Sequence, residues 1–400
     1  MYRTISLLKS TRCAGAMAMT VERSKEKQVP PFGRNDKMEF RNGKLEFRND
    51  KMEFRNDKMD LGDDRRDAGE RQDLWAPTCA TAGAVVWAGM AMLARMGIAR
   101  VGAIELLFLF APLVIAPLGI ELGRGMGGTG RLEELGRRLQ PVGAGMVVVA
   151  MCLPPGSTAG LAAVGWMVVC GLMAGGGVVG LVRSSLVRSS LVRSSWKDAD
   201  RSVRATLVVA RLDLAVGGAW LVASRLGMRP MGIQEPIGLL TAVHFHFAGF
   251  ATAMIAAATL RFATVTGLSQ RWLKPVVLMV AGMPVVVAVG FVISPALKMM
   301  AAILFSASVA GLAIAVRACG RKAEDGTARI LLQVAAGAVF AGMVLSASYA
   351  VADYSGSEVL TIPQMARTHG ILNAMGFCLA GLLGWLVENS SCQLSVPSGQ

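Results

Sequence analysis

The chain has 400 residues, of which 53% are hydrophobic and only 17% are charged, and its mean hydropathy is +0.49. Soluble domains carry about 25% charged residues, so this composition excludes an ordinary soluble fold and predicts a protein that lies mostly in a lipid bilayer. The net charge of +14 does not indicate a nucleic-acid partner, because 17 of the 41 Lys and Arg residues precede residue 75. Most of the others lie between apolar runs, where membrane topology accounts for them.

The first 74 residues are polar, basic and repetitive. Seven-residue units begin at Phe40, Phe47 and Phe54, but their apolar residues do not follow the three-and-four spacing of a coiled coil. Because the segment has few core-forming residues, we predict that residues 1–74 form a disordered basic tail. Seven cysteines are scattered along the chain without a CxxC pair or zinc-ligand spacing, which argues against a disulfide scaffold.

Ten apolar segments follow the tail, most of them close to the roughly 20 residues that a membrane helix needs. They are residues 76–94, 101–121, 141–155, 159–181, 205–224, 237–259, 275–294, 297–316, 330–351 and 369–387. The third is the shortest. We therefore predict an all-α, polytopic transmembrane bundle of about ten spans over residues 75–388. A basic loop with three LVRSS copies is expected at 182–204, and a short tail at 389–400.

The basic residues between these segments predict the orientation of the bundle. If the connections are assigned alternately to two sides, one side holds 17 Lys and Arg residues and the other holds 6, before the tail is counted. The positive-inside rule places the richer side in the cytoplasm, together with both termini. The expected location is the cell membrane, with the lipid bilayer as the main partner.

All three histidines lie in two short motifs inside apolar segments. His244 and His246 belong to residues 241–250, and His369 belongs to residues 367–373. With the predicted orientation, all three lie in the outer half of the membrane, His244 and His246 roughly 10–14 Å along their helix. An ionisable side chain at such a depth is a candidate for function.

Helical spacing predicts which way these side chains face. Two stripes combine a histidine with small residues, one of His246, Gly249, Ala253 and Ala256, the other of His369, Asn373, Gly376 and Ala380. Small residues let membrane helices approach closely, so we predict that the sixth and tenth segments pack together through these stripes. His244 lies about 200° from His246 on an ideal helix, so only one of the two faces a given point.

Two interpretations of the histidines remain open. Neutral imidazole binds metals and haem iron, so His244, His246 and His369, with Asn373 beside them, predict a metal or cofactor site for haem, copper or zinc. Alternatively, each histidine hydrogen bonds to a neighbouring helix or lines a polar cavity. Glu105 and Asp213 are further polar residues inside the membrane; Asp213 is expected to serve either a proton or ion pathway or a structural contact.

Three distinctive strings are residues 104–117, the segment 239–250 with its HFHFAGF string, and residues 368–377. They resemble the YndJ-like family of bacterial integral membrane proteins. The resemblance covers roughly residues 100–387 and implies a bacterial polytopic membrane protein. It carries no activity over to this chain, but it draws attention to the same polar positions, Glu105, His244, His246, His369 and Asn373.

Three classes of function fit the sequence: a metal- or haem-binding redox or sensor protein, a transporter or channel for a small molecule or ion, and a non-catalytic membrane component. No GxSxG, HExxH or Walker motif occurs, so hydrolase chemistry of the soluble type is disfavoured. The sequence does not decide whether the protein is an enzyme. A cavity lined by the polar residues favours transport, whereas bound metal or visible absorbance favours the first class.

Overall fold

A computed structural model describes residues 74–127, 130–186, 195–269, 271–357 and 360–394. The predicted tail therefore lies outside the described residues, apart from Leu74, and so does most of the LVRSS repeat. The described part consists of helices joined by turns and short loops, and it has no strand. It is a multi-pass helical membrane protein, as the composition predicts.

All ten predicted segments are confirmed as helices. In chain order they are α3 (Trp75–Arg95); α4 (Ala103–Phe110), η1 (Ala111–Ile115) and α5 (Ala116–Gly127); α6 (Arg131–Cys152); α7 (Ser157–Leu186); α8 (Ser195–Arg225); α9 (Ile237–His244), η3 (Phe245–Ala251) and α10 (Thr252–Val265); α11 (Leu273–Ile293); α12 (Pro295–Gly320); α13 (Gly326–Ser355); and α14 (Ile362–Met365), η4 (Ala366–Gly370), η5 (Leu372–Leu379) and α15 (Ala380–Leu394). A short 3-10 turn, η2 (Pro230–Gly232), precedes α9. Helices α7 and α8 extend into the range predicted as the 182–204 loop, and α15 extends into the predicted C-terminal tail.

Nine of the ten helices in the described part are long and apolar enough to cross a membrane. The exception is α6, whose first two turns carry Arg131, Glu133, Glu134, Arg137 and Arg138. Its apolar stretch, residues 141–152, extends only about 18 Å at 1.5 Å per residue, less than the roughly 30 Å hydrocarbon core. The predicted orientation depends on α6 crossing the membrane, so the cytoplasmic position of the termini stays a prediction.

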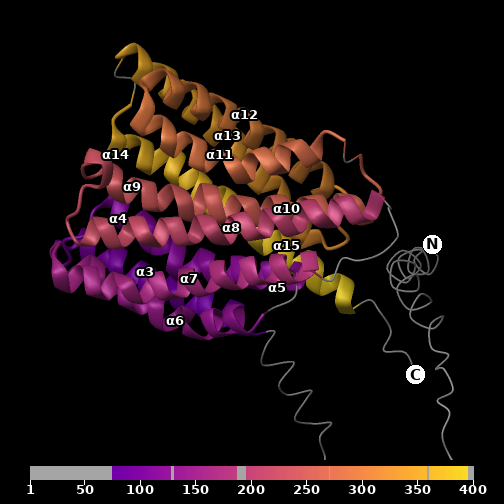
Figure 1. The fold of residues 1–400 in the computed structure, drawn as a ribbon, viewed down its shortest axis with the longest axis horizontal. Coiled ribbons are helices and arrows are strands. Elements are labelled where there is room, and N and C mark those ends of the chain that lie inside the picture. Colours follow the sequence, from indigo (N-terminus) through magenta and orange to yellow (C-terminus); the bar gives the residue numbers. More distant parts are fainter. Residues whose placement is uncertain (1–73, 128–129, 187–194, 270, 358–359, 395–400) are drawn as a thin grey trace, which may run out of the picture. The chain divides into compact units, whose positions relative to one another are not determined.

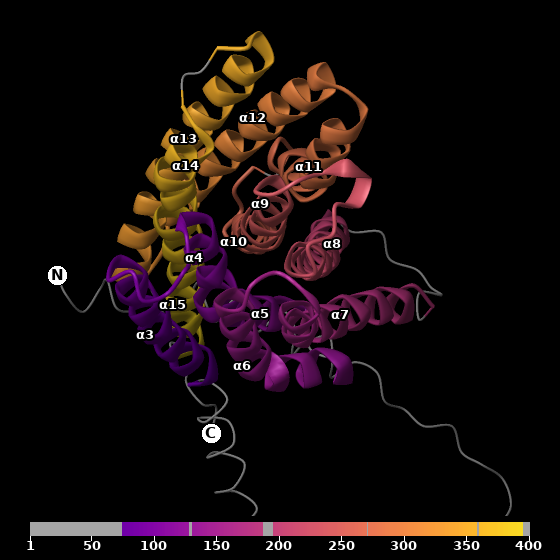
Figure 2. The same cartoon turned by 90° about the vertical axis from the view of Figure 1, so that its left-hand side faces the viewer.

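Consecutive helices pack as neighbours in two groups. One group contains α6, α7 and α8, and the other contains α11, α12 and α13 (Figures 1 and 2). The sixth segment, α9–η3–α10, contacts both groups and is the most buried of the nine candidate spans, whereas α3 is the least buried. The HFHFAGF string therefore lies at the centre of the bundle.

Three helices of the bundle contain π-helical turns that lie against one another. These turns are η1, η3 and η5, and each contacts the other two. A π-helical turn interrupts the regular hydrogen-bond ladder of an α-helix, and such turns are frequent at functional sites. The three strings that carry the family resemblance overlap these turns, so the irregular backbone and the distinctive residues occupy one region.

Candidate functional site

His246 is a buried histidine that has both ring nitrogens engaged. The indole Nε1 of Trp166 donates to its Nε2 over 2.8 Å, and its Nδ1 lies 2.8 Å from the carbonyl oxygen of Ala242. Its side chain is 1% exposed, and the ring of Phe108 packs edge-on against it at 4.9 Å. Because a carbonyl oxygen only accepts, Nδ1 carries the proton and Nε2 accepts from Trp166. The ring is thus neutral and fully hydrogen bonded, and a metal ion could bind it only after one of these bonds breaks.

The stripe that contains His246 faces α8, not the tenth helix. A Cβ on Gly217 would lie 2.6 Å from Nδ1 of His246, and a Cβ on Gly249 would lie 2.7 Å from Cβ of Asp213. Each helix therefore places a polar side chain over a glycine of the other. Small-residue packing is therefore confirmed for Gly249 of this stripe, and the helix that this glycine meets is α8.

The stripe of the tenth helix likewise faces a different helix, α13. A Cβ on Gly342 would lie 2.9 Å from the amide nitrogen of Asn373, and a Cβ on Gly376 would lie 2.6 Å from Cβ of Ala338. Close approach again depends on small residues. The predicted contact between the sixth and tenth helices is confirmed, although the glycines of the two stripes meet α8 and α13.

His244 and His369 line a cavity of about 470 Å³ between the sixth, seventh, eighth, ninth and tenth helices of the bundle. The lining is mainly apolar, with Phe247, Phe291 and Phe305 among its side chains. The polar residues that line it are Thr241, His244, Thr252, Lys298, Ser346, Tyr349, Asp353, His369 and Asn373. An apolar cavity of several hundred Å³ with a few polar groups has the usual form of a small-molecule site.

Both cavity histidines hold their Nδ1 against a backbone carbonyl. Nδ1 of His244 lies 2.7 Å from the oxygen of Leu240, and Nδ1 of His369 lies 2.9 Å from the oxygen of Gly342. Asn373 donates from its side-chain nitrogen to the carbonyl oxygen of His369 at 2.7 Å. These contacts fix the two rings in the cavity wall.

An ion pair joins two helix ends beside this cavity. Nζ of Lys298, in the first turn of α12, lies 2.6 Å from Oδ2 of Asp353, in the last turn of α13. The same nitrogen lies 5.0 Å from the ring centre of Phe291, within the range of a cation–π contact. Both charged residues line the cavity, so their charges largely compensate each other there.

Glu105 and Asp213 do not belong to the cavity lining. Glu105 lies in the first turn of α4 and is partly exposed. Asp213 is 2% exposed in α8, and its Oδ2 has no hydrogen-bond partner among the described residues. The six predicted site residues are therefore divided: His244, His369 and Asn373 share the cavity, whereas His246, Asp213 and Glu105 lie elsewhere.

No group of three or more His, Cys, Asp or Glu side chains in the described part of the chain is arranged to hold a metal ion. The predicted three-histidine set is divided, because His246 faces Trp166 and Phe108 while His244 and His369 face the cavity. The cause is the roughly 200° between residues two apart on a helix.

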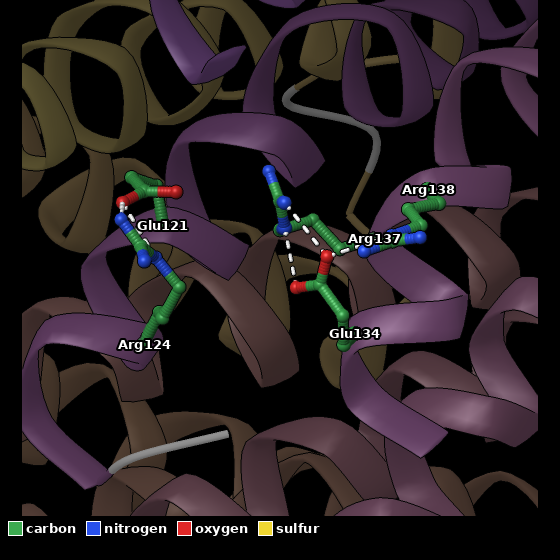
Figure 3. Close-up of polar contacts among 5 residues, drawn as sticks. All are labelled: Glu121, Arg124, Glu134, Arg137 and Arg138. Atoms are coloured by element: carbon green, nitrogen blue, oxygen red, sulfur yellow. Dashed lines mark hydrogen bonds and ion pairs between the residues drawn. The ribbon is translucent and has the colours of Figure 1, made fainter. Parts of the chain in front are cut away.

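A second polar cluster lies in α5, at the end of the second predicted segment, and in the first turns of α6. Oε1 of Glu121 lies 2.8 Å from Nε of Arg124, and Glu134 lies between Arg137 and Arg138, as Figure 3 shows. The two oxygens of Glu134 accept from Arg137 at 2.8 and 2.9 Å. This cluster coincides with a basic connection for which the charge pattern predicts a cytoplasmic position.

Acid should weaken this cluster at a measurable pH. The hydrogen bonds from Arg137 lower the pKa of Glu134 from 4.5 to about 2; Glu134 precedes the apolar part of α6 and lies outside the nine spans. Its stabilising contribution is present above pH 4.5 and is lost as the pH falls towards 2. Between pH 4.5 and 2, the melting temperature of Glu134→Gln should fall by about 2 °C less than that of the wild type. This is the size of effect expected for a partly exposed ion pair. Melting curves of the purified protein test this, and an unchanged pH profile in the variant would contradict it.

Several cavity residues were not predicted from the sequence as site residues. They include Lys298, Asp353, Ser346 and Tyr349. A usable signal existed, because the lysine at the start of α12 and the aspartate at the end of α13 lie on the same predicted side with opposite charges. Ser346 and Tyr349 are three residues apart and hence on one face of α13.

Comparison with known proteins agrees with this architecture. The model of the family described as YndJ-like protein matches residues 106–377, which contain η1, η3 and η4 and most of η5. The chain is 28% identical over 196 residues to the "Uncharacterized membrane protein YndJ" of Bacillus subtilis (strain 168), an alignment that covers 49% of this chain and 35% of that protein. The chain thus matches about a third of the length of this relative. No solved structure matches the chain.

Proposed function

The chain belongs to the YndJ-like family, and from this premise we propose that it is a transporter-type protein of the bacterial cell membrane that binds a small amphipathic molecule in the cavity beside His244 and His369. The observation that carries the proposal is the cavity itself, about 470 Å³ of mainly apolar space with polar groups gathered on its wall. Such a lining suits a molecule with an apolar body and one polar end.

The irregular helices favour transport over a purely structural role. Substrate sites of membrane transporters are commonly formed where spanning helices are interrupted, because the interruption exposes backbone groups and permits movement. Two of the helices that line this cavity contain π-helical turns, in η3 and in η4–η5, and both cavity histidines lie within or directly beside them.

Haem fits this cavity poorly, although two histidines line it. A haem carries two negatively charged propionates, which need cationic or hydrogen-bonding partners in an apolar site. Lys298 is the one cation that lines the cavity among the described residues, and Asp353 already pairs with it. A metal held by the three predicted histidines fits no better, because His246 points away.

Blocking the cavity should remove the bound molecule. Ala302 lines the cavity, whereas Leu304, two residues later on α12, is 48% exposed and faces outward. Mass spectrometry of organic extracts from gently purified protein should find one molecule enriched in the wild type and in Leu304→Trp. The same molecule should be reduced about tenfold or more in Ala302→Trp, because an indole would fill the space. Equal extracts from all three proteins would contradict the proposal, and a Soret band in the visible spectrum would revive the haem interpretation.

A transport cavity should also be reached by water. Ser346 lines the cavity, and Val344 on the same helix is 55% exposed on the outer surface. In a background without native cysteines, Ser346→Cys should react with a charged thiol reagent at least about tenfold faster than Val344→Cys, because only a hydrated thiol forms the reactive thiolate. Equal slow labelling at both positions would mean a cavity sealed from water.

A further inference from the structure

Hydrogen-bond geometry fixes the tautomer of both cavity histidines. Nδ1 of His244 and Nδ1 of His369 each lie within 2.9 Å of a backbone carbonyl oxygen, and such an oxygen can only accept. Each Nδ1 therefore carries a proton and donates it. A second proton on either ring would place a positive charge in an apolar cavity whose one carboxylate among the described residues, Asp353, is already paired. Both rings are consequently neutral, and each Nε2 has a lone pair.

These two lone pairs have no protein donor of good geometry. Nε2 of His244 has no hydrogen bond with any residue that the structure describes, and its side chain is exposed to the cavity. The amide nitrogen of Asn373 lies 3.2 and 3.3 Å from the two ring nitrogens of His369. Such nearly equal distances place it over the ring, not along either lone pair, which lies in the ring plane. Its shorter bond, 2.7 Å, goes to the carbonyl oxygen of His369.

An apolar cavity with two unused acceptors selects the chemistry of its ligand. A carboxylate or phosphate has no proton to donate at neutral pH and would bring an uncompensated charge, since Lys298 is bound to Asp353. An ammonium group donates but would also bring a charge without a free partner. A hydroxyl donates a hydrogen bond and carries no charge.

We propose that the ligand of this cavity is a neutral amphiphile whose hydroxyl group donates a hydrogen bond to Nε2 of His244 or His369 while its apolar body lies among the phenylalanine side chains. This inference rests on the proposed function, because it assumes that the cavity is a binding site. The hydroxyl could belong to a long-chain alcohol or to the head of a neutral lipid, and the shared chemistry is the uncharged donor on an apolar body.

Photolabelling with matched probes tests the inference on the intact protein in lipid nanodiscs. Three ten-carbon probes carry a diazirine at the same chain position and differ only in the head group: decanol, decanoate and decylamine. Peptide mass spectrometry maps the labelled residues. We expect the alcohol to label the cavity-lining peptides about tenfold more than the other two probes, the effect of one to two hydrogen bonds, and unlabelled decanol to compete.

Two sets of variants separate the head-group inference from the proposed function. Ala302→Trp should reduce labelling by all three probes, whereas His244→Phe with His369→Phe should remove only the preference for the alcohol. Each single histidine variant should give part of that loss, and His246→Gln serves as a matched control in which the preference stays.

The outcomes are distinct. Labelling of the cavity by all three probes equally, or mostly by decanoate or decylamine, overturns the hydroxyl inference and leaves the cavity as a binding site. Labelling by none of the probes, with no difference between Ala302→Trp and the wild type, overturns the proposed function as well. The comparison of the three probes on the wild-type protein needs no variant, so a variant that fails to fold does not prevent the test.

Discussion

Replacing Glu133 with alanine should destabilise the bundle by about 3–5 kcal/mol, because it leaves a buried guanidinium without its counter-ion. Oε1 of Glu133 in α6 lies 2.9 Å from Nη1 of Arg211 in α8, and the two side chains are only 6% and 11% exposed. The pair lies against two glycines of α7: a Cβ on Gly176 would lie 2.4 Å from Cγ of Glu133, and one on Gly177 would lie 3.1 Å from Cδ of Arg211. The ion pair thus links α6 to α8 across the surface of α7, where Gly176 and Gly177 leave room for the two side chains.

A double variant distinguishes the loss of charge balance from the loss of packing. Glu133→Leu with Arg211→Met removes both charges and keeps similar volume, so it should recover most of the lost stability, as replacements of buried ion pairs by apolar residues often do. Denaturant titration of the purified protein, followed by circular dichroism, measures the free energy of unfolding. If Glu133→Ala and the double variant unfolded at the same denaturant concentration as the wild type, the pair would have no structural role.

Substitution by alanine should lower the free energy of unfolding much more at His246 than at His244, although both belong to the HFHFAGF string. His246→Ala removes a fully buried ring and leaves Nε1 of Trp166, a side chain that is 0% exposed, without its acceptor. The cavity and the unpaired donor together should lower the free energy of unfolding by about 3–5 kcal/mol. His244→Ala changes a side chain exposed to the cavity, and its cost should stay below about 1 kcal/mol.

Substitution of His244 should reduce the amount of bound molecule, whereas substitution of His246 should not. His244→Ala should purify with reduced bound molecule at nearly normal stability, whereas the more conservative His246→Gln should keep the bound molecule at reduced stability. Melting curves and mass spectrometry of the same preparations give both quantities. Equal losses of stability in His244→Ala and His246→Ala would show that the division between a structural and a cavity histidine is wrong.

The number of helices follows from the sequence because it depends on a local quantity, the length of an apolar run against the thickness of a bilayer. All ten segments were located in this way, including the weak third one. Its true helix begins ten residues earlier, at Arg131, because Glu134 and its arginine neighbours pair within the first turns and make a charged stretch helical. Hydropathy alone reads such a stretch as a loop.

Pairings between helices do not follow from the sequence in the same way. The small-residue stripe of the sixth helix was recognised, yet its partner is α8, and nothing in the spacing distinguishes α8 from the tenth helix. Trp166 and His246 are 80 positions apart, and Glu133 and Arg211 belong to segments that look unrelated in the sequence. The 200° between His244 and His246 did predict that they would face different surroundings, but only the packing decides which of them faces the cavity.

The π-helical turn in the sixth helix changes the direction in which the first half of the helix faces relative to the second half. One residue corresponds to about 100° around an α-helix, so the additional residue in η3 rotates everything before it relative to everything after it. His244 therefore faces the cavity, while Gly249 lies against Asp213 of α8 and α10 contacts the same helix. A chain shortened by one residue within 245–251 could form an unbroken α-helix and still span the bilayer. The half of the helix before this segment would then be turned away from the cavity, so the length of the segment sets the alignment of the site with the rest of the bundle.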